Sequence, residues 1–170
     1  MSVVATTKHI FLSRLDTLNH LIEIGANHFA DDPAGLLARR LAPDMFPFGA
    51  QIVLTCNQPR NFALWCKGEN HPNPSLELPS LTAAKETIAQ TKELVHSIPE
   101  DDGLLAQSKR MDFGQGLYLE LTGRDYINEF LIPNFYFHLM AVYAILRMAG
   151  APVGKRDYMI HLMPLMQKAE

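Results

Sequence analysis

The polar residues best placed for chemistry lie in an apolar stretch near the end of the chain. Asn134 and His138 are four residues apart, so on a helix their side chains lie one turn from each other on one face. Pro133 cannot donate a backbone hydrogen bond, which leaves the carbonyl of Glu129 free. An unpaired buried amide or imidazole costs about 1 to 3 kcal/mol, so these groups need partners. We therefore expect an interior polar site around Asn134 and His138.

Three kinds of partner fit such a site. The first is a hydrogen-bonded knot in which Asn134 and His138 fix helix register, together with Gln51 or Gln58 from another helix. The second is a pocket for an unidentified small molecule. The third is a bound metal, for which His138 is the strong transition-metal ligand of the group. The spacing of the residues leaves all three open.

Short catalytic motifs are missing from the sequence. It has no Cys-x-x-Cys pair, no His-Glu-x-x-His motif and no phosphate-binding glycine loop. Cys56 and Cys66 are ten residues apart in one predicted helix, a separation of about 15 Å that is beyond the reach of a disulfide. We expect both to be small buried apolar residues in a reducing compartment.

Two segments in the first half of the chain have the apolar spacing of three and four residues that is typical of amphipathic helices. The first runs from Lys8 to about Asn27, and its His20 is expected to face solvent. The second is expected to begin at Asp44, whose side chain would cap it, and to be kinked by Pro59.

Two further helices are predicted over residues 80–98 and 123–148, after a loop at 69–79. In the last helix the pattern places one inward stripe at Ile127, Phe130, Asn134, Phe137, Ala141, Ala144 and Met148, with Leu131, His138 and Ile145 beside it. The sequence therefore predicts an all-α protein, a four-helix bundle with one long connection between its third and fourth helices.

In that connection the spacing of the apolar residues changes from three or four to two. Residues 109–121 alternate apolar and polar positions around Gly114, Gln115 and Gly116, which predicts a small β-hairpin whose leucines lie on the helices. The acidic residues 100–102 before it are expected to form a solvated turn. After the last helix, the apolar tail from Tyr158 to Met166 should pack on the bundle or on a second subunit.

Composition limits the class of protein. The 170 residues, 48% of them hydrophobic, fit a single domain over residues 1–170. The net charge of −3 leaves no basic face, so we expect no nucleic-acid partner. The longest apolar run, Leu139 to Leu146, has eight residues, and the start of the chain has no secretion signal. We therefore expect no membrane passage and a cytoplasmic location.

Four motifs resemble those of a bacterial family known only as a domain of unknown function. They are LAPDMFP at Leu41–Pro47, PNFYFH at Pro133–His138, AILR at Ala144–Arg147 and GKRD at Gly154–Asp157. That family looks like a branch of the DinB-like (YfiT-like) superfamily of four-helix bundles, and the resemblance covers nearly the whole chain.

The resemblance implies a particular site. DinB-like proteins often bind a divalent metal through three histidines, one in helix two and two spaced four apart in helix four, shortly before a Leu-Arg pair. Counted back from Leu146-Arg147, the later histidine of the pair falls on His138 and the earlier one on Asn134, while the third ligand falls on Gln51. Amide oxygens are weak ligands for nickel or zinc, so the resemblance implies a degenerate metal site.

Three hypotheses follow from the residues and the resemblance. The leading one is a non-catalytic DinB-like bundle without a cofactor, expected to be a homodimer, in which Gln51, Asn134 and His138 bind an unidentified small molecule or lock the core. The alternative is a metal-dependent hydrolase or thiol transferase that holds a divalent metal such as nickel or zinc through His138. The third is an interaction module that docks through its apolar tail.

Overall fold

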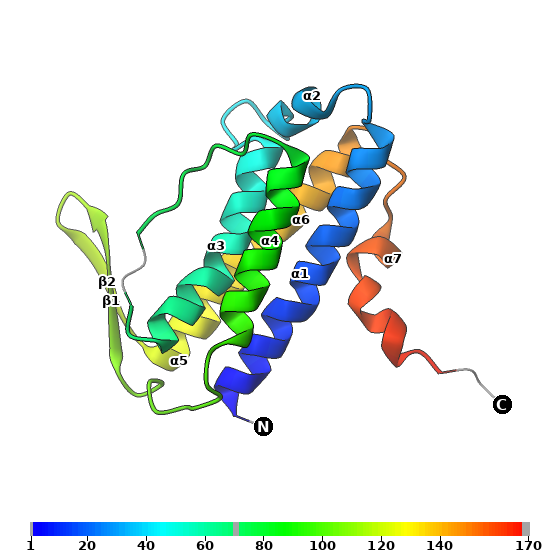
Figure 1. Ribbon diagram of the computed structural model, residues 1–170. Helices are drawn as coiled ribbons and strands as arrows, with labels where there is room; N and C mark the ends of the chain where they lie inside the picture. Colours follow the sequence, from blue (N-terminus) through cyan, green and yellow to red (C-terminus); the bar gives the residue numbers. More distant parts are fainter. Residues whose placement is uncertain (1, 70–71, 168–170) are drawn as a thin grey trace.

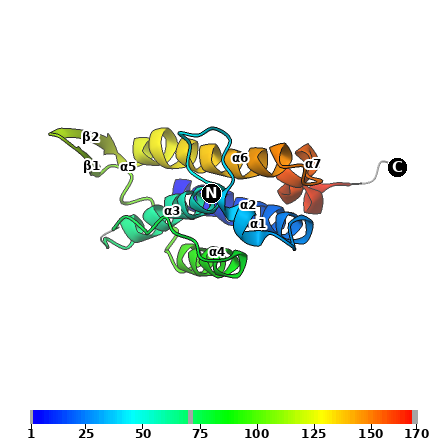
Figure 2. The same cartoon turned by 90° about the horizontal axis from the view of Figure 1, so that it is seen from above.

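The computed structural model describes residues 2–69 and 72–167, and most of them are helical. The four longest helices of this part are α1 (Val3–His28), α3 (Phe48–Cys66), α4 (Leu81–His96) and α6 (Ile132–Met148). They lie side by side along the length of the molecule (Figures 1 and 2), with α3 in contact with both α4 and α6. The prediction of a mostly helical protein is therefore confirmed, although shorter helices lie between these four.

Aromatic rings from three of these helices meet at the centre of the core. The ring of Phe11 in α1 lies 5.6 Å from that of Phe62 in α3 and 5.0 Å from that of Phe135 in α6, measured between centroids. All three side chains are fully buried. Tilted and edge-on ring pairs contribute about 0.5–1.5 kcal/mol beyond the burial of their area, so these contacts fix the three helices relative to one another.

Helix α1 begins at Val3 rather than at the predicted Lys8. The hydroxyl of Ser2 accepts a hydrogen bond from the amide of Ala5, and the carboxylate of Asp102 accepts from the amides of Val3 and Val4, each at 2.9 Å. These backbone donors hold the pKa of Asp102 below its usual range. Asp102 is thus not the solvated turn residue that the sequence suggested, because the first turn of α1 needs acceptors for its free amides.

The prediction that Asp44 caps the second long helix is wrong. Asp44 is exposed in a turn, and α3 begins at Phe48 after Pro47, with no side-chain cap. The amide of Phe48 instead donates to the backbone carbonyl of Arg39 at 2.8 Å. Before this turn lies a short helix that was not predicted, α2 (Pro33–Ala38), which Asp32 caps by accepting from the amide of Gly35.

The last long helix is continuous from Gly123 to Met148, as predicted, but its hydrogen bonding changes along the way. It begins as α5 (Gly123–Asp125), capped by Thr122, and widens into a π-helical segment, η1 (Tyr126–Leu131), before α6. The amide of Ile132 donates to the carbonyl of Ile127, five residues back. The wide turn ends next to Pro133, which cannot donate at all.

Residues 108–122 form the predicted β-hairpin, with β1 (Ser108–Gly114) antiparallel to β2 (Leu117–Thr122). Gln115 and Gly116 at its tip have φ values of 52° and 77°, the backbone that a tight hairpin turn requires. The hairpin projects from one side of the helices (Figure 1), and Leu117 and Leu119 are 67% and 43% exposed. The prediction that its leucines lie on the helices is therefore wrong for these two, whereas Leu121 packs against the core and the ring of Phe113 lies 6.3 Å from that of Phe130 in η1.

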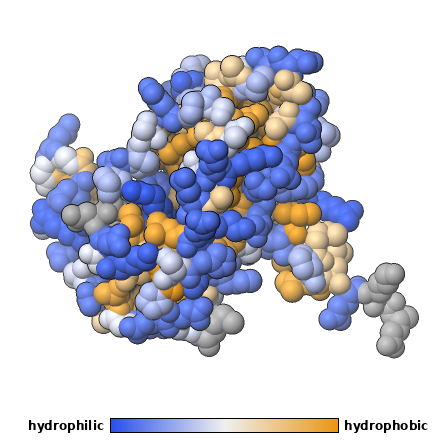
Figure 3. All heavy atoms as spheres, viewed as in Figure 1, coloured by the Kyte–Doolittle hydropathy of each residue, from blue (hydrophilic) through white to orange (hydrophobic). Residues whose placement is uncertain are grey.

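The C-terminal segment folds back along α1, on the opposite side of the molecule from the hairpin (Figure 1). It contains α7 (Lys155–Tyr158) and a 3-10 turn, η2 (Ile160–Leu165). Asp157 joins it to α1: one carboxylate oxygen lies 3.0 Å from Nε2 of His20, and the other accepts from the amide of Gly154 at 2.8 Å. His20 was expected to face solvent, but this contact half-buries it. Apolar side chains remain on the surface of η2 (Figure 3).

By length and composition alone, the helix from Gly123 to Met148 could cross a membrane. Of its most apolar stretch of 18 residues, 44% is buried in the molecule, and the core helix of a soluble protein has the same properties. This single helix is weak evidence for a membrane protein, and the cytoplasmic location remains a prediction.

The start of the last helix gives a test of the packing. A Cβ at Gly123 would lie 2.5 Å from the Trp65 ring and 2.6 Å from the carbonyl oxygen of Leu104. Gly123→Ala should therefore lower the free energy of unfolding by about 1 to 3 kcal/mol, because a backbone atom must move. Gly154→Ala is the matched control, since its nearest atom would lie at 3.9 Å. Denaturant unfolding of both variants measures the difference, and equal midpoints would contradict this account.

Candidate functional site

The structure brings together two of the three predicted site residues, Gln51 and His138. Gln51 lies in the first turn of α3 and is 1% exposed, and His138 lies in α6, on the face that packs against α3. The distance from Oε1 of Gln51 to Nδ1 of His138 is 2.8 Å. The contact between α3 and α6 thus contains a side-chain hydrogen bond between a buried amide and a half-buried imidazole.

The bonding of Gln51 fixes the direction of this hydrogen bond. Its Nε2 donates to the backbone carbonyl of Phe46 at 3.2 Å, so its oxygen is turned toward His138. An amide oxygen only accepts, and His138 must therefore carry its proton on Nδ1. In a neutral imidazole the other nitrogen, Nε2, then has a free lone pair. Among residues 2–69 and 72–167, Nε2 has no hydrogen-bond partner, and it is not one of the fully buried unpaired atoms, so at least part of it is accessible to solvent.

Burial keeps this imidazole neutral. Loss of hydration lowers the pKa of His138 to about 4, because water solvates the imidazolium ion better than the interior of the helices does. At neutral pH the side chain is therefore an acceptor at Nε2 and a donor at Nδ1. Such a group can accept a hydrogen bond from a ligand, act as a weak base toward it, or bind a metal.

Asn134 does not join the pair. Its side-chain amide donates to the carbonyl of Phe130, one turn back in its own helix, at 2.7 Å. That carbonyl lies in the π-helical segment η1, where the backbone pairing is shifted. Gln58, the other amide considered for the knot, contacts the carbonyl of Leu54 at 3.5 Å, and its own oxygen is buried without a partner. The expected knot therefore reduces to Gln51 and His138.

The inward face of α6 is also displaced from the predicted stripe. Phe137 and Met148 were expected inside and are 60% and 55% exposed. The fully buried residues of this helix form a neighbouring face and are Phe135, Leu139, Val142, Ile145 and Leu146. Because α6 is apolar on nearly all sides, its sequence cannot indicate which face meets the other helices. The π-helical turn before it also rotates the residues that follow relative to an uninterrupted α-helix.

The cysteines offer no reactive thiolate. Both are free, and burial raises the pKa of the Cys56 and Cys66 thiols to about 12. A thiol is nucleophilic only as the thiolate, and these remain protonated at neutral pH. The prediction that Cys56 is a buried apolar residue is confirmed, and Cys66 is half-buried at the end of α3.

The side chains around His138 do not fit a divalent transition metal. The oxygen of Gln51 is occupied by His138, and Asn134 is turned to its own helix. No group of three or more His, Cys, Asp or Glu side chains in residues 2–69 and 72–167 is placed to hold a metal ion. One imidazole nitrogen is left, whereas zinc sites in proteins use three or four strong ligands. Gln51 is in the place of an orienting partner of His138, a contact that metal-binding histidines also make.

The chain as a whole is similar in structure to a solved DinB family protein. The crystal structure of a DinB family member protein from Shewanella denitrificans matches it with a TM-score of 0.81 and 28% sequence identity, over 99% of this chain and 96% of that one. The model of the family described as a domain of unknown function, DUF1993, matches residues 4–159. The chain belongs to this family and is a DinB-like protein. No match was found among curated proteins.

The His138 environment predicts a pH dependence of stability. In the unfolded chain His138 titrates near its ordinary pKa of about 6.5, but in the folded protein its pKa is about 4. Between these values the unfolded state binds more protons, so the free energy of unfolding should fall as the pH is lowered from about 6.5 toward 4. The largest slope that one group can give is about 1.4 kcal/mol per pH unit.

Chemical denaturation at several pH values across this window measures the effect. In His138→Gln the part of the slope that comes from this residue should be missing, while other titrating groups still contribute. Wild type and His138→Gln with identical pH profiles would show that the imidazole is not held neutral.

Proposed function

We propose that this protein is a four-helix DinB-type bundle that binds a small organic molecule at His138, without a resident metal and without catalysing a reaction. The observation that carries the proposal is the fixed tautomer of His138. Its Nδ1 is held by a buried amide, and its Nε2 is a neutral acceptor that is at least partly accessible to solvent. A ligand with a hydroxyl or N–H group would donate to Nε2.

Two features of the Gln51–His138 pair support a role in binding a small molecule rather than a purely structural role in the core. A group that serves only to lock the core needs no accessible nitrogen, yet Nε2 of His138 has no partner in the described chain and is not fully buried. Gln51 in turn is held at both ends of its amide, so the imidazole cannot rotate freely. A pre-oriented acceptor loses little conformational entropy when a ligand binds. Phe46, whose carbonyl holds Gln51, has a half-exposed ring at the same end of α3.

The alternative, a metal-dependent hydrolase or thiol transferase, has less support. Such an enzyme needs an ion held by several strong ligands, and the amides at Gln51 and Asn134 are engaged in other hydrogen bonds. The relative from Shewanella denitrificans is described only as a DinB family member. Fold similarity alone does not transfer an activity.

A zinc titration followed through the ring nitrogens of His138 tests the proposal. In wild type labelled with ¹⁵N-histidine, Nδ1 of His138 should appear protonated, and stoichiometric zinc should leave its signals unchanged. The double variant Gln51→His with Asn134→His is the matched control, because it restores three imidazoles and should bind zinc. Small phenols and amides added to wild type should shift Nε2 saturably.

Two results would overturn this function. One is near-stoichiometric binding of zinc, nickel or manganese to wild type that is lost in His138→Ala. The other is a protonated Nε2 in wild type, because that nitrogen would then have no lone pair to offer.

We further propose that the protein is a homodimer. An apolar stripe on the outer face of α6 supports this: Phe137, Met140 and Met148 are 60%, 47% and 55% exposed, at spacings of three and eight residues that keep them on one side of the helix. Apolar side chains gathered on one helix face are typical of interaction sites, and the described part of the chain provides nothing that covers these three.

The stripe can be tested by one charged substitution. Phe137→Glu should convert a dimer to a monomer, because a carboxylate in an apolar interface loses its hydration without gaining a partner. Leu117→Glu is the control, since Leu117 is 67% exposed beside the turn of the hairpin. Light scattering after size-exclusion chromatography gives the mass of each. A monomeric wild type, or a Phe137→Glu variant that stays dimeric, would remove the support for this interface.

A further inference from the structure

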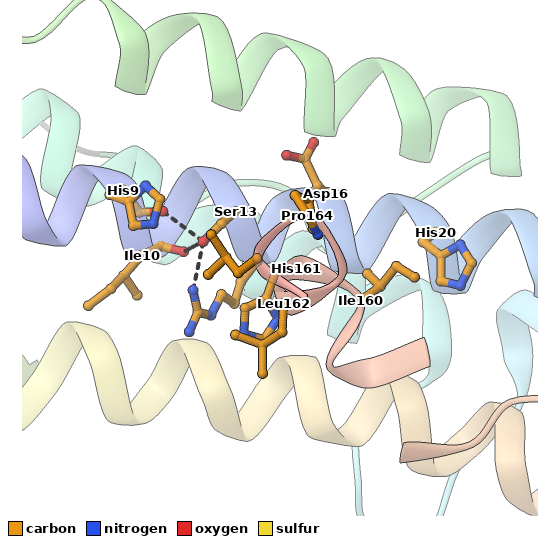
Figure 4. A pocket seen from close by; sticks show the side chains of 11 residues that line it. His9, Ile10, Ser13, Asp16, His20, Ile160, His161, Leu162 and Pro164 are labelled. Atoms are coloured by element: carbon orange, nitrogen blue, oxygen red, sulfur yellow. Dashed lines mark hydrogen bonds between the residues drawn. The ribbon is translucent and has the colours of Figure 1, made fainter. Parts of the chain in front are cut away.

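A groove of about 610 Å³ lies between the first half of α1 and the C-terminal turn η2 (Figure 4). His9, Ile10 and Arg14 line it from α1, and His161 and Leu165 are among the residues that line it from η2. Its size is within the range of about 300–1,000 Å³ that is usual for small-molecule sites. It shares no residue with the His138 pair, so what it binds is a separate question.

The acidic residue in this groove is already neutralised. Asp16 forms an ion pair with Lys92 of α4. His20, at the other end of the groove, contacts Asp157 of α7. The first pair joins α1 to α4 and the second joins α1 to α7, so the one acidic residue that lines the groove, Asp16, already has a positive partner.

Arg14 by contrast has no acidic partner among the described residues. Its Nη1 donates to the hydroxyl of Ser13 at 2.7 Å, and its Nε is buried without any acceptor. A guanidinium has five donors, arranged as a fork that matches a carboxylate. The groove therefore contains one positive charge that the described chain does not balance.

His161 lines the same groove as Arg14 and also has hydrogen-bonding groups without a partner among residues 2–69 and 72–167. Both of its ring nitrogens are buried and have no hydrogen-bond partner in the described chain. Burial and the nearby Arg14 and His9 lower its pKa, so it is a neutral imidazole with one N–H and one lone pair. A buried polar group without a partner destabilises the fold, and a ligand with suitable oxygens would supply the missing acceptor.

We propose that this groove binds a small monocarboxylic acid with an apolar tail. The carboxylate accepts hydrogen bonds from the guanidinium of Arg14 and from the N–H of His161, whose half-buried side chains turn toward it on binding, and the tail lies along Ile10, Ile160 and Leu165. A single negative charge matches the single unbalanced guanidinium. A phosphate with two charges would bring one charge too many into a groove whose remaining walls are largely apolar.

Calorimetric titration with decanoate tests this site. Wild type should bind decanoate saturably. It should bind decanol more weakly because decanol has no carboxylate, and acetate more weakly because acetate has no long apolar tail. Arg14→Gln should weaken decanoate binding about tenfold or more, as expected when a charged hydrogen bond is lost. Leu165→Glu should do the same, and since Leu165 is 72% exposed this variant should fold normally even if Arg14→Gln does not.

Arg110→Gln is the matched control, because it removes one positive charge from the hairpin on the far side of the molecule. Its affinity for decanoate should equal that of wild type, and thermal unfolding checks that every variant is folded. Three results would overturn the proposal: no saturable decanoate binding by wild type, unchanged affinity in both folded groove variants, or tighter binding of decyl phosphate than of decanoate.

Discussion

The hydrogen bond between Gln51 and His138 connects the two helices that carry most of the site, and its geometry follows from one constraint. A buried amide must satisfy both its oxygen and its nitrogen. The nitrogen of Gln51 is satisfied by the carbonyl of Phe46, just before α3 begins, which leaves only the oxygen for α6. The tautomer of His138 and the lone pair on Nε2 follow from this arrangement, whereas its neutral state follows from burial, which lowers its pKa.

The same requirement for partners explains how the ends of the chain are held. Asp102 provides acceptors for the first amides of α1, and Asp157 fastens the C-terminal segment to His20. Both carboxylates have their pKa values lowered, mainly by backbone donors. Where such pairing is incomplete, at Arg14 and His161, the unpaired groups lie together in one groove. In the described part of the chain, buried polar atoms without a partner also occur at Thr17, Asn57 and Gln58, but three of the six belong to Arg14 and His161, which line this groove. Such atoms are uncommon in folded proteins, and this pairing of two such residues supports the proposed second site.

The two amides at positions where the resemblance implied metal-binding histidines each have a hydrogen bond of their own. Gln51 orients the remaining imidazole, and Asn134 pairs with a carbonyl in the π-helical turn. One imidazole nitrogen of His138 is thereby left with a fixed direction, and the proposed binding of a hydrogen-bond donor rests on it.

The sequence by itself determined the mostly helical fold and the position of the hairpin, because apolar periodicity and turn residues act locally. It named His138, Asn134, Gln51 and Gln58 as candidates, but which of them meet was decided by the packing of α3 against α6. It did not determine the start of α3 or the fate of Asp102, since their partners, Arg39 and the first turn of α1, are brought near only by folding. The inward face of α6 was also decided by tertiary packing, because a helix that is apolar on nearly every side has no preferred face of its own. The unpaired Arg14 and His161 come from opposite ends of the chain, and only their meeting in the folded molecule creates the groove.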